Sequence, residues 1–505
     1  MTLRTWMNGW PRRACVIGFS IAVGLLPAGA ALAVTTIMVN TTDDGVDISP
    51  GDGNCSTVAQ PALPICTLRA AVTESNRMPG GAEIMLPPGT YNLTIPASIA
   101  DGEENGDLNL IVAFGYAPGP TTITGSGAAT TIIDAHGNDR ILHIDATRSV
   151  TITGVSFVNG SLAGSGTKLG GGIYNQGSLA LTDCIVSHNA VGYGNGGGVF
   201  NEGYLAALRV TFNDNTAQSY GGGIYNSISS QLVLSQCTVS ANKAIDGAGI
   251  YNASDYYPYS QVDLTEITGN TATGSGGGVA NAYSASRLSI TRSTVSNNAA
   301  AGGRGGGVDN NGILYAGNST ISANSSKTDG GGFYNSATGN SHFYNSTIAY
   351  NQSDSNADNI GVGPGIFNAV GAAFYLRNSV VAANTYPGPY SLTLYQDCSG
   401  ALTAFGKNRF YTLIGCSVTQ ADGGSTTVPV PLAALGALQD NGGPTRTIAL
   451  LPVAGANLID FASNCVDENG TLNTDQRGRP RPVGASCDVG AFEYDPGDIF
   501  INGFQ

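Results

Sequence analysis

The chain has 505 residues and a formal charge of −14, and only 11% of its residues are charged. Glycine occupies 72 positions and lysine only four, which is typical of a long repeat protein with an acidic surface. Such a surface repels phosphate backbones and anionic headgroups, so the composition argues against nucleic acid and acidic lipid as partners.

Residues 1–33 have the pattern of a signal peptide. Three arginines precede the apolar run ACVIGFSIAVGLL, and a small-residue Ala-Leu-Ala site ends at Ala33. No other segment reaches the ~18 consecutive apolar residues of a membrane span, so we expect no transmembrane segment. We therefore expect an exported protein, extracellular or on the cell surface, whose charge becomes −17 when the three arginines are removed.

The cysteines fit an exported protein, because an oxidising compartment permits disulfides. Of nine cysteines, Cys15 leaves with the leader and eight remain. Three pairs are close in sequence and are predicted disulfides: Cys55 with Cys66, Cys398 with Cys416, and Cys465 with Cys487.

Residues 34–80 are predicted to form an N-terminal cap, and an acidic cluster follows them. The cluster contains Asp101, Glu103, Glu104 and Asp107, whose oxygens are candidate Ca²⁺ ligands. Acids on solvated turns have the same pattern, and no other cofactor is expected. The four histidines are scattered, without a ligand pair at metal-site spacing, and are interpreted as solvated or loop residues.

Residues 81–420 contain a repeat of about 25 residues that begins with glycines. The string GGGIYN at 170–175 recurs as GGGVFN, GGGIYN, GAGIYN, GGGVAN, GGGVDN, GGGFYN and GPGIFN. Its last residue forms a column without exception: Asn175, Asn201, Asn226, Asn252, Asn281, Asn310, Asn335 and Asn368. A second column ends each repeat: Asn189, Asn215, Asn242, Asn270, Asn298, Asn324, Asn351 and Asn384. Apolar and polar residues alternate between the columns, which indicates strands.

Three short strands in a repeat of this length predict one turn of an all-β, right-handed parallel β-helix with roughly 11–13 coils. The glycines then turn tight corners, Ile173 points inward, Tyr174 points outward, and the Asn amides bond from coil to coil. Residues 421–495 are predicted to form a C-terminal cap that covers the exposed strand edges, followed by a tail at 496–505.

Cys184 and Cys237 fall in one column of the repeat, with Val210 between them. At the stacking distance they are about 9.6 Å apart, whereas a disulfide needs Cα atoms within about 7 Å. We predict that both remain unpaired thiols in the core.

The longest corner loop is the candidate ligand site. It contains Asp255, Tyr256, Tyr257 and Tyr259, and the next coil adds Tyr283 and Arg287 on the same edge. Exposed aromatic rings beside polar groups can stack on sugars or contact a protein. The alternative is a packed loop that only decorates the coil.

No catalytic residues are predicted. Asp183 with Arg209, and Glu266 with Arg292, are interpreted as surface ion pairs between coils. The helix lacks the Gly-His-Gly and Arg-Ile-Lys strings of polygalacturonase-type enzymes. The outward row Tyr174, Phe200, Tyr225 and Tyr251 is interpreted as a stacking ladder.

Both flanks resemble known families. CTLRAA at 66–71, after GDGNC, resembles the motif of CSLREA-domain proteins, with Ala70 in place of the usual Glu. LQDNGGPTRTIALLPVAGANLID and TDQRGRPRPVGASCDVGAFE, within 438–493, resemble a choice-of-anchor Q domain. The central repeats are similar to those of polymorphic outer membrane proteins. The resemblance implies a secreted or outer-membrane-associated β-helix of a Gram-negative bacterium and implies no chemistry.

We therefore expect a monomeric, adhesin-like or glycan-binding protein without catalytic activity. Its partner would be a polysaccharide, or a glycan or protein of a cell surface. The alternative is a polysaccharide lyase or glycoside hydrolase on the pectate-lyase-like fold, which would need a carboxylate cluster beside a basic residue.

Overall fold

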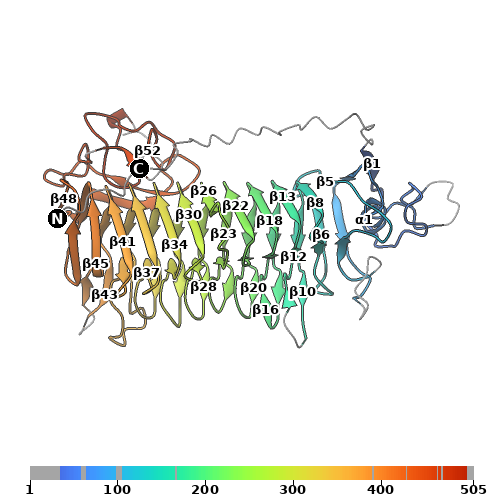
Figure 1. Ribbon diagram of the computed structural model, residues 1–505, viewed down its shortest axis with the longest axis horizontal. Coiled ribbons are helices and arrows are strands. Elements are labelled where there is room, and N and C mark those ends of the chain that lie inside the picture. Colours follow the sequence, from blue (N-terminus) through green and yellow to red (C-terminus); the bar gives the residue numbers. More distant parts are fainter. Residues whose placement is uncertain are drawn as a thin grey trace, which may run out of the picture.

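The computed structural model describes residues 34–58, 64–97, 105–164, 168–388, 392–427, 429–462, 464–467 and 470–497. The expected signal peptide lies outside these residues, as do Asp101, Glu103 and Glu104. Over the described residues, coils of parallel strands stack along one long axis (Figure 1). The predicted all-β parallel β-helix is therefore confirmed.

Most coils contribute one strand to each of three long sheets, which we name A, B and C. Sheet A contains β1 (Thr35–Met38), β2 (Ala82–Leu86), β5 (Thr121–Gly125), β8 (Ser149–Thr153), β13 (Ser178–Thr182), β18 (Tyr204–Leu208), β22 (Gln231–Ser235), β26 (Ser260–Asp263), β30 (Arg287–Thr291), β34 (Ile313–Gly317), β38 (Asn340–Tyr344), β41 (Ala373–Arg377), β45 (Cys398–Phe405) and β47 (Cys416–Gln420). Sheet B contains 13 strands: β3 (Gly89–Asn92), β6 (Thr131–Asp134), β9 (Ser156–Val158), β14 (Ile185–Ser187), β19 (Thr211–Asn213), β23 (Thr238–Ser240), β27 (Glu266–Thr268), β31 (Thr294–Ser296), β35 (Thr320–Ser322), β39 (Thr347–Ala349), β42 (Val380–Ala382), β46 (Lys407–Phe410) and β48 (Ser425–Thr427).

Sheet C shares β45 with sheet A. Its other strands are β4 (Leu108–Leu110), β7 (Leu142–Ile144), β12 (Ile173–Asn175), β17 (Val199–Asn201), β21 (Ile224–Asn226), β25 (Ile250–Asn252), β29 (Val279–Asn281), β33 (Val308–Asn310), β37 (Phe333–Asn335) and β40 (Ile366–Asn368). A corner sheet of two-residue strands joins B to C: β10 (Ser161–Leu162), β15 (Ala190–Val191), β20 (Thr216–Ala217), β24 (Lys243–Ala244), β28 (Thr271–Ala272), β32 (Ala299–Ala300) and β36 (Ser325–Ser326). Short pairs complete the strands: β11 (Lys168–Leu169) with β16 (Gly194–Asn195), β43 (Thr385–Pro387) with β44 (Thr393–Tyr395), β49 (Leu435–Gln439) with β50 (Thr447–Leu450), and β51 (Val466–Asp467) with β52 (Gly470–Thr471).

The glycines turn the corner before sheet C, as the sequence predicts. Gly170 has φ of +69°, and the equivalent glycine of the next coil, Gly196, has φ of +71°. A Cβ on Gly196 would also lie 2.6 Å from the carbonyl oxygen of Val199. A side chain here would therefore be strained in its own backbone and would meet the start of the following strand.

The two Asn columns form buried hydrogen-bond ladders. In the first, each Nδ2 donates to Oδ1 of the next Asn at 2.7–2.9 Å, from Asn175 through Asn368. In the second, from Asn189 through Asn384, the same bonds measure 2.9–3.1 Å. Asp397 terminates the second ladder, because its Oδ1 accepts from Asn384 Nδ2. These bonds fix the register of neighbouring coils and satisfy amides that would otherwise be costly to bury.

The three predicted disulfides form, and Cys184 and Cys237 are free and buried in the core. Burial raises the pKa of each free thiol to about 11. Both thiols are therefore protonated at neutral pH and poorly reactive.

The N-terminal end is covered by α1 (Leu68–Ser75), whose Leu68, Ala71 and Val72 join the core. Arg69 at the start of this helix pairs with Asp44 at 2.7 Å, and both side chains are buried. Asp107, which is adjacent in space, pairs with Arg140 at 2.9 Å and is buried. This one described member of the candidate Ca²⁺ cluster therefore already has a cationic partner.

The C-terminal segment, residues 430–497, lies along the side of the helix (Figure 1). Its contacts reach back to coils far away in sequence: Arg446 Nε lies 3.1 Å from Glu266 Oε1, and Thr320 donates to Gln476 at 2.6 Å. Its apolar residues pack on Val380 and Ala382 of sheet B. The segment packs on the outer face of sheet B, and its first residue bonds to the last coil through the Val430 amide and the Phe410 carbonyl at 2.9 Å.

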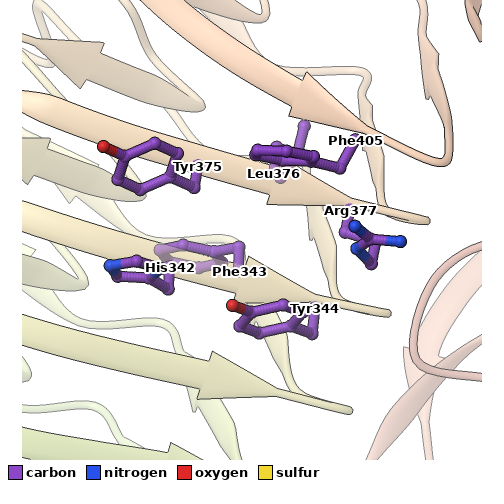
Figure 2. Close-up of a pocket in the computed structure, with 7 residues that line it drawn as sticks. All are labelled: His342, Phe343, Tyr344, Tyr375, Leu376, Arg377 and Phe405. Atoms are coloured by element: carbon purple, nitrogen blue, oxygen red, sulfur yellow. The ribbon is translucent and has the colours of Figure 1, made fainter. Parts of the chain in front are cut away.

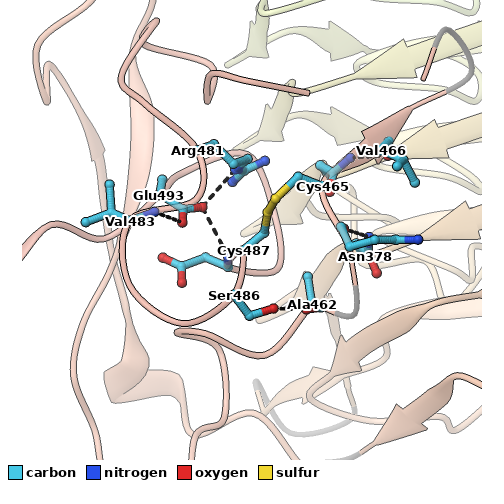
Figure 3. The surroundings of a disulfide bond; sticks show 12 residues. Asn378, Ala462, Cys465, Val466, Arg481, Val483, Ser486, Cys487 and Glu493 are labelled. Atoms are coloured by element: carbon cyan, nitrogen blue, oxygen red, sulfur yellow. Dashed lines mark hydrogen bonds and ion pairs between the residues drawn. A yellow bond between two sulfur atoms is a disulfide. The ribbon is translucent and has the colours of Figure 1, made fainter. Parts of the chain in front are cut away.

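A buried network holds this segment together (Figure 3). The Cys465–Cys487 disulfide links its two halves, and Arg481 Nε lies 2.8 Å from Glu493 Oε2 with both side chains fully buried. Asn378 of the helix donates to the Asn464 carbonyl at 2.7 Å beside the disulfide.

Candidate functional site

The predicted loop lies at the corner between sheets C and A. Tyr257 and Tyr283 are exposed there by 73% and 48%, and Tyr256 is exposed beside them. The Asp255 Oδ1 accepts from the Ser229 amide of the preceding coil at 3.2 Å. The loop therefore presents aromatic rings outward and keeps its carboxylate on the neighbouring coil.

Tyr259 connects the loop to sheet A. Its ring lies 6.0 Å from the Tyr257 ring, and the guanidinium of Arg287 lies 5.6 Å above it. On its other side, Tyr259 meets Tyr315 edge to face at 5.3 Å. Tyr315 belongs to β34, two coils further along, and the small Ser289 on β30 leaves room for the two rings to meet.

From Tyr315 the rings continue along the outer face of sheet A. His342 on β38 stacks on Tyr315 at 4.7 Å and meets Tyr375 on β41 at 4.6 Å. Tyr375 lies 6.3 Å from Phe405 on β45. We call Tyr257, Tyr259, Tyr315, His342, Tyr375 and Phe405 the aromatic ridge.

A cavity of about 220 Å³ opens at the far end of the ridge (Figure 2). Its lining consists of His342, Phe343, Tyr344, Tyr375, Leu376, Arg377 and Phe405, so this lining contains no carboxylate. Arg377 extends beside Phe405, with its guanidinium 5.2 Å above the ring. Burial lowers the pKa of His342 to about 4, so its imidazole is neutral at neutral pH and both donates and accepts. The interpretation of His342 as a solvated loop residue is wrong.

A second set of rings runs along sheet C. Phe200, Tyr225 and Tyr251 stack nearly parallel at 4.7 and 5.0 Å, and Tyr174 meets Phe200 at 5.7 Å. Phe200 and Tyr251 are buried, and the Tyr174 hydroxyl donates to Glu202 at 2.6 Å. The interpretation of this row as a stacking ladder is confirmed, and we call it the ladder of sheet C.

The ladder of sheet C is interrupted by Ala280 and Asp309. The Asp309 carboxylate is buried, and its Oδ2 lies 3.4 Å from Arg304 Nε, while Oδ1 has no hydrogen-bond partner. Burial raises the pKa of Asp309 to about 6. Among the described residues, no group of three or more His, Cys, Asp or Glu side chains is placed to hold a metal ion.

One predicted surface ion pair is present and the other is not. Arg209 and Asp183 pair at 2.7 Å with both side chains half exposed. Arg292 pairs with Asp263 through two hydrogen bonds rather than with Glu266. Glu266 is taken by Arg446 of the C-terminal segment.

Sequence reasoning missed most of the ridge. Tyr315, His342 and Tyr375 occupy one repeat position, nine residues before the second Asn of each coil. Earlier coils place Ala180, Ala206, Val233, Gln261 and Ser289 there, so rings gather only in the later coils. Comparing outward positions column by column would have found this change.

The part of the chain that the structure describes contains no helix with the length and apolarity of a membrane span.

No protein-family model and no curated protein sequence matches this chain. Among solved structures, a pectate lyase matches with 14% identity and a TM-score of 0.43, over 92% of this chain and 98% of that one. The A-module of a mannuronan C-5 epimerase from Azotobacter vinelandii matches with 14% identity and a TM-score of 0.40, over 72% and 94%. The catalytic domain of an α-1,3-glucanase, in complex with nigerose, matches with 11% identity and a TM-score of 0.35, over 75% and 70%. These scores are too low to indicate a function for this chain.

Proposed function

We propose that this chain is an exported, non-catalytic protein that binds polysaccharide along the aromatic ridge of sheet A. The observation that carries the proposal is the continuous series of six rings from Tyr257 to Phe405, which ends at a cavity without a carboxylate. The C–H bonds of one sugar face are attracted to the electron-rich face of an aromatic ring, and the hydroxyls at the edges meet polar neighbours.

The scaffold suits a long ligand. The rings lie on stacked strands whose register is fixed by the Asn ladders, so little order would be lost when a polymer binds. The strands β34, β38, β41 and β45 place successive rings along the helix axis. A polysaccharide chain could contact several rings at once, and several weak contacts together give a higher affinity than any one of them.

Export is the setting that we propose for this activity. Three disulfides link the chain, and structural disulfides form and persist in oxidising compartments. Attachment to an outer membrane through the flanks remains a further proposal from their resemblance to surface proteins.

The enzyme alternative depends on a different place, the Asp309–Arg304 pair on sheet C. A buried carboxyl group with a raised pKa beside a cation is a typical feature of an acid catalyst. The alternative therefore predicts that Asp309→Asn abolishes polymer cleavage, whereas the binding proposal predicts no cleavage at all.

The test uses insoluble and immobilised polysaccharides and follows both retention and polymer length. We expect the protein to be retained on at least one polymer without shortening it. Tyr375→Ala should weaken retention, while Tyr193→Ala, which removes a more exposed tyrosine on a distant corner, should not. Shortening of any polymer would replace this proposal with the enzyme alternative.

A further inference from the structure

Two arginines beside the aromatic ridge lack the close carboxylate partner that most of the other described arginines have. Eight arginines of the described chain lie within 3.4 Å of a carboxylate oxygen. Arg287 and Arg377 do not. Both of these lie beside ridge rings.

Arg287 contacts a ring rather than an acid. Its guanidinium lies over Tyr259, and within the described residues no carboxylate is found at ion-pair distance from it. Asp255, the nearest acid of the loop in sequence, accepts from the Ser229 amide and hydroxyl on the preceding coil. The fork of N–H donors on Arg287 is therefore directed by an aromatic contact and is available to a ligand.

Arg377 has one distant acidic neighbour, Asp422, at 3.7 Å. This ion pair is longer than a hydrogen bond, and the carboxylate accepts its hydrogen bonds from the Gly406 amide at 2.9 Å and from Gln420 Nε2 at 2.8 Å. Arg377 therefore retains most of its donors, and it is the only charged residue in the described lining of the ridge cavity. His342 adds no charge there at neutral pH, because burial lowers its pKa to about 4.

We infer that the ridge takes an anionic polysaccharide, whose carboxylate or sulfate groups bind Arg287 and Arg377 while its sugar rings stack on the tyrosines between them. This inference rests on the proposed function of the same site. A guanidinium matches the two oxygens of a carboxylate or sulfate with two parallel hydrogen bonds, which a neutral sugar cannot offer. The rings between the two arginines explain why a polymer, rather than a free anion, is the ligand.

The test compares polymers that differ only in charge. Native gel electrophoresis through polygalacturonate, its methyl-esterified form, dextran and dextran sulfate would measure the retardation of the full chain. We expect retardation in polygalacturonate, dextran sulfate or both, depending on which anion fits, and little in dextran or the esterified polymer. Retardation in the charged polymers should fall with salt.

Variants separate this inference from the proposed function. Arg287→Gln with Arg377→Gln should weaken binding of the anionic polymer about tenfold or more, since two charge-assisted hydrogen-bonding groups are lost. Arg209→Gln, which removes a surface arginine held by Asp183, is the matched control and should leave binding unchanged.

Each outcome has a distinct meaning. Equal binding of dextran or esterified polymer, or unchanged binding by the double arginine variant, would overturn the anionic inference and leave the glycan-binding proposal standing. Binding of no polymer would overturn the proposed function itself. Equal retention on polyglutamate, unaffected by Tyr375→Ala, would overturn both, because charge alone would then explain the binding.

Discussion

The ladder of sheet C and the ridge of sheet A are two rows of aromatic rings on one helix, and they differ in what their rings contact. In the ladder, Phe200 and Tyr225 are parallel within 5°, and Phe200 is only 4% exposed. In the ridge, Tyr259 and Tyr315 meet at 64°, and a cavity opens beside the last rings. Rings stack across neighbouring coils in both rows, since His342 lies on Tyr315 at 4.7 Å, and the ridge differs in its oblique Tyr259–Tyr315 contact and in the cavity beside its last rings.

The polar groups follow the same division. The Tyr174 hydroxyl of the ladder is bonded to Glu202, and Arg140 lies over its ring while paired with Asp107. On the ridge, Arg287 has a ring contact without an acidic partner. We therefore interpret the ladder as structural, while the binding that we propose for the ridge rests on its cavity and on the arginines beside it.

The largest expected effect is the loss of binding on removing two ridge rings. Tyr315→Ala with Tyr375→Ala should weaken polysaccharide binding about 100-fold, because central aromatic contacts each contribute ~1–2 kcal/mol. The unfolding midpoint in urea should change little, since both rings lie on the outer face. Isothermal titration with a soluble polymer would measure the affinity, and binding within twofold of the unchanged chain would contradict the comparison.

Removing a ladder ring should give the opposite pattern. Phe200→Ala deletes a buried ring between Tyr174 and Tyr225 and should lower the free energy of unfolding by about 3 kcal/mol. Polysaccharide affinity should stay the same below the unfolding transition. Urea denaturation followed by circular dichroism measures the loss, and a stable variant that no longer binds polymer would assign the ligand to the ladder instead.

Asp309, which interrupts the ladder, should make stability depend on pH. Burial raises its folded pKa to about 6 from an unfolded value of 3.8, so the folded state retains a proton that the unfolded state loses. Stability should therefore fall as pH rises between these values and stay lower above them. Asp309→Asn should be about 1–2 kcal/mol more stable than the unchanged chain at pH 8 and similar to it at pH 4. Urea titrations at the two pH values would test this, and a destabilised variant at pH 8 would show that the attraction of Arg304 outweighs the cost of burying the carboxylate.

The smallest effect is expected at His342. Its pKa is lowered to about 4 by burial, so the imidazole stays neutral from pH 5 to 8 and binding should not follow a histidine titration in that range. His342→Gln, which keeps a donor and an acceptor but removes the ring, should weaken binding only a few-fold. A steep rise in affinity as pH falls through 6 would indicate that His342 carries charge on the ridge.

Much of the fold could be predicted because the repeat reports it directly. The Asn columns, the inward position of Ile173 and the spacing of Cys184 from Cys237 all follow from the spacing of coils. Contacts within one coil, or between adjacent coils, join residues that the repeat places in register, so the sequence predicts them.

The features that sequence reasoning missed depend on longer-range packing. Arg292 has two acids nearby, Asp263 and Glu266. It pairs with Asp263, because Glu266 pairs with Arg446, which lies 180 residues further along the chain. The ridge likewise joins Tyr259 to Tyr315 across an intervening coil. No local pattern indicates that a terminal segment will fold back on sheet B or that two rings will meet over Ser289.

The most direct test of the central claim is to incubate the full chain with polygalacturonate and dextran sulfate and to measure retention and polymer length together. We predict that the protein is retained on an anionic polymer of unchanged length, that the double variant Tyr315→Ala with Tyr375→Ala loses retention, and that Phe200→Ala keeps it below its unfolding transition. Shortening of the polymer, or full retention of the double ridge variant, would contradict it.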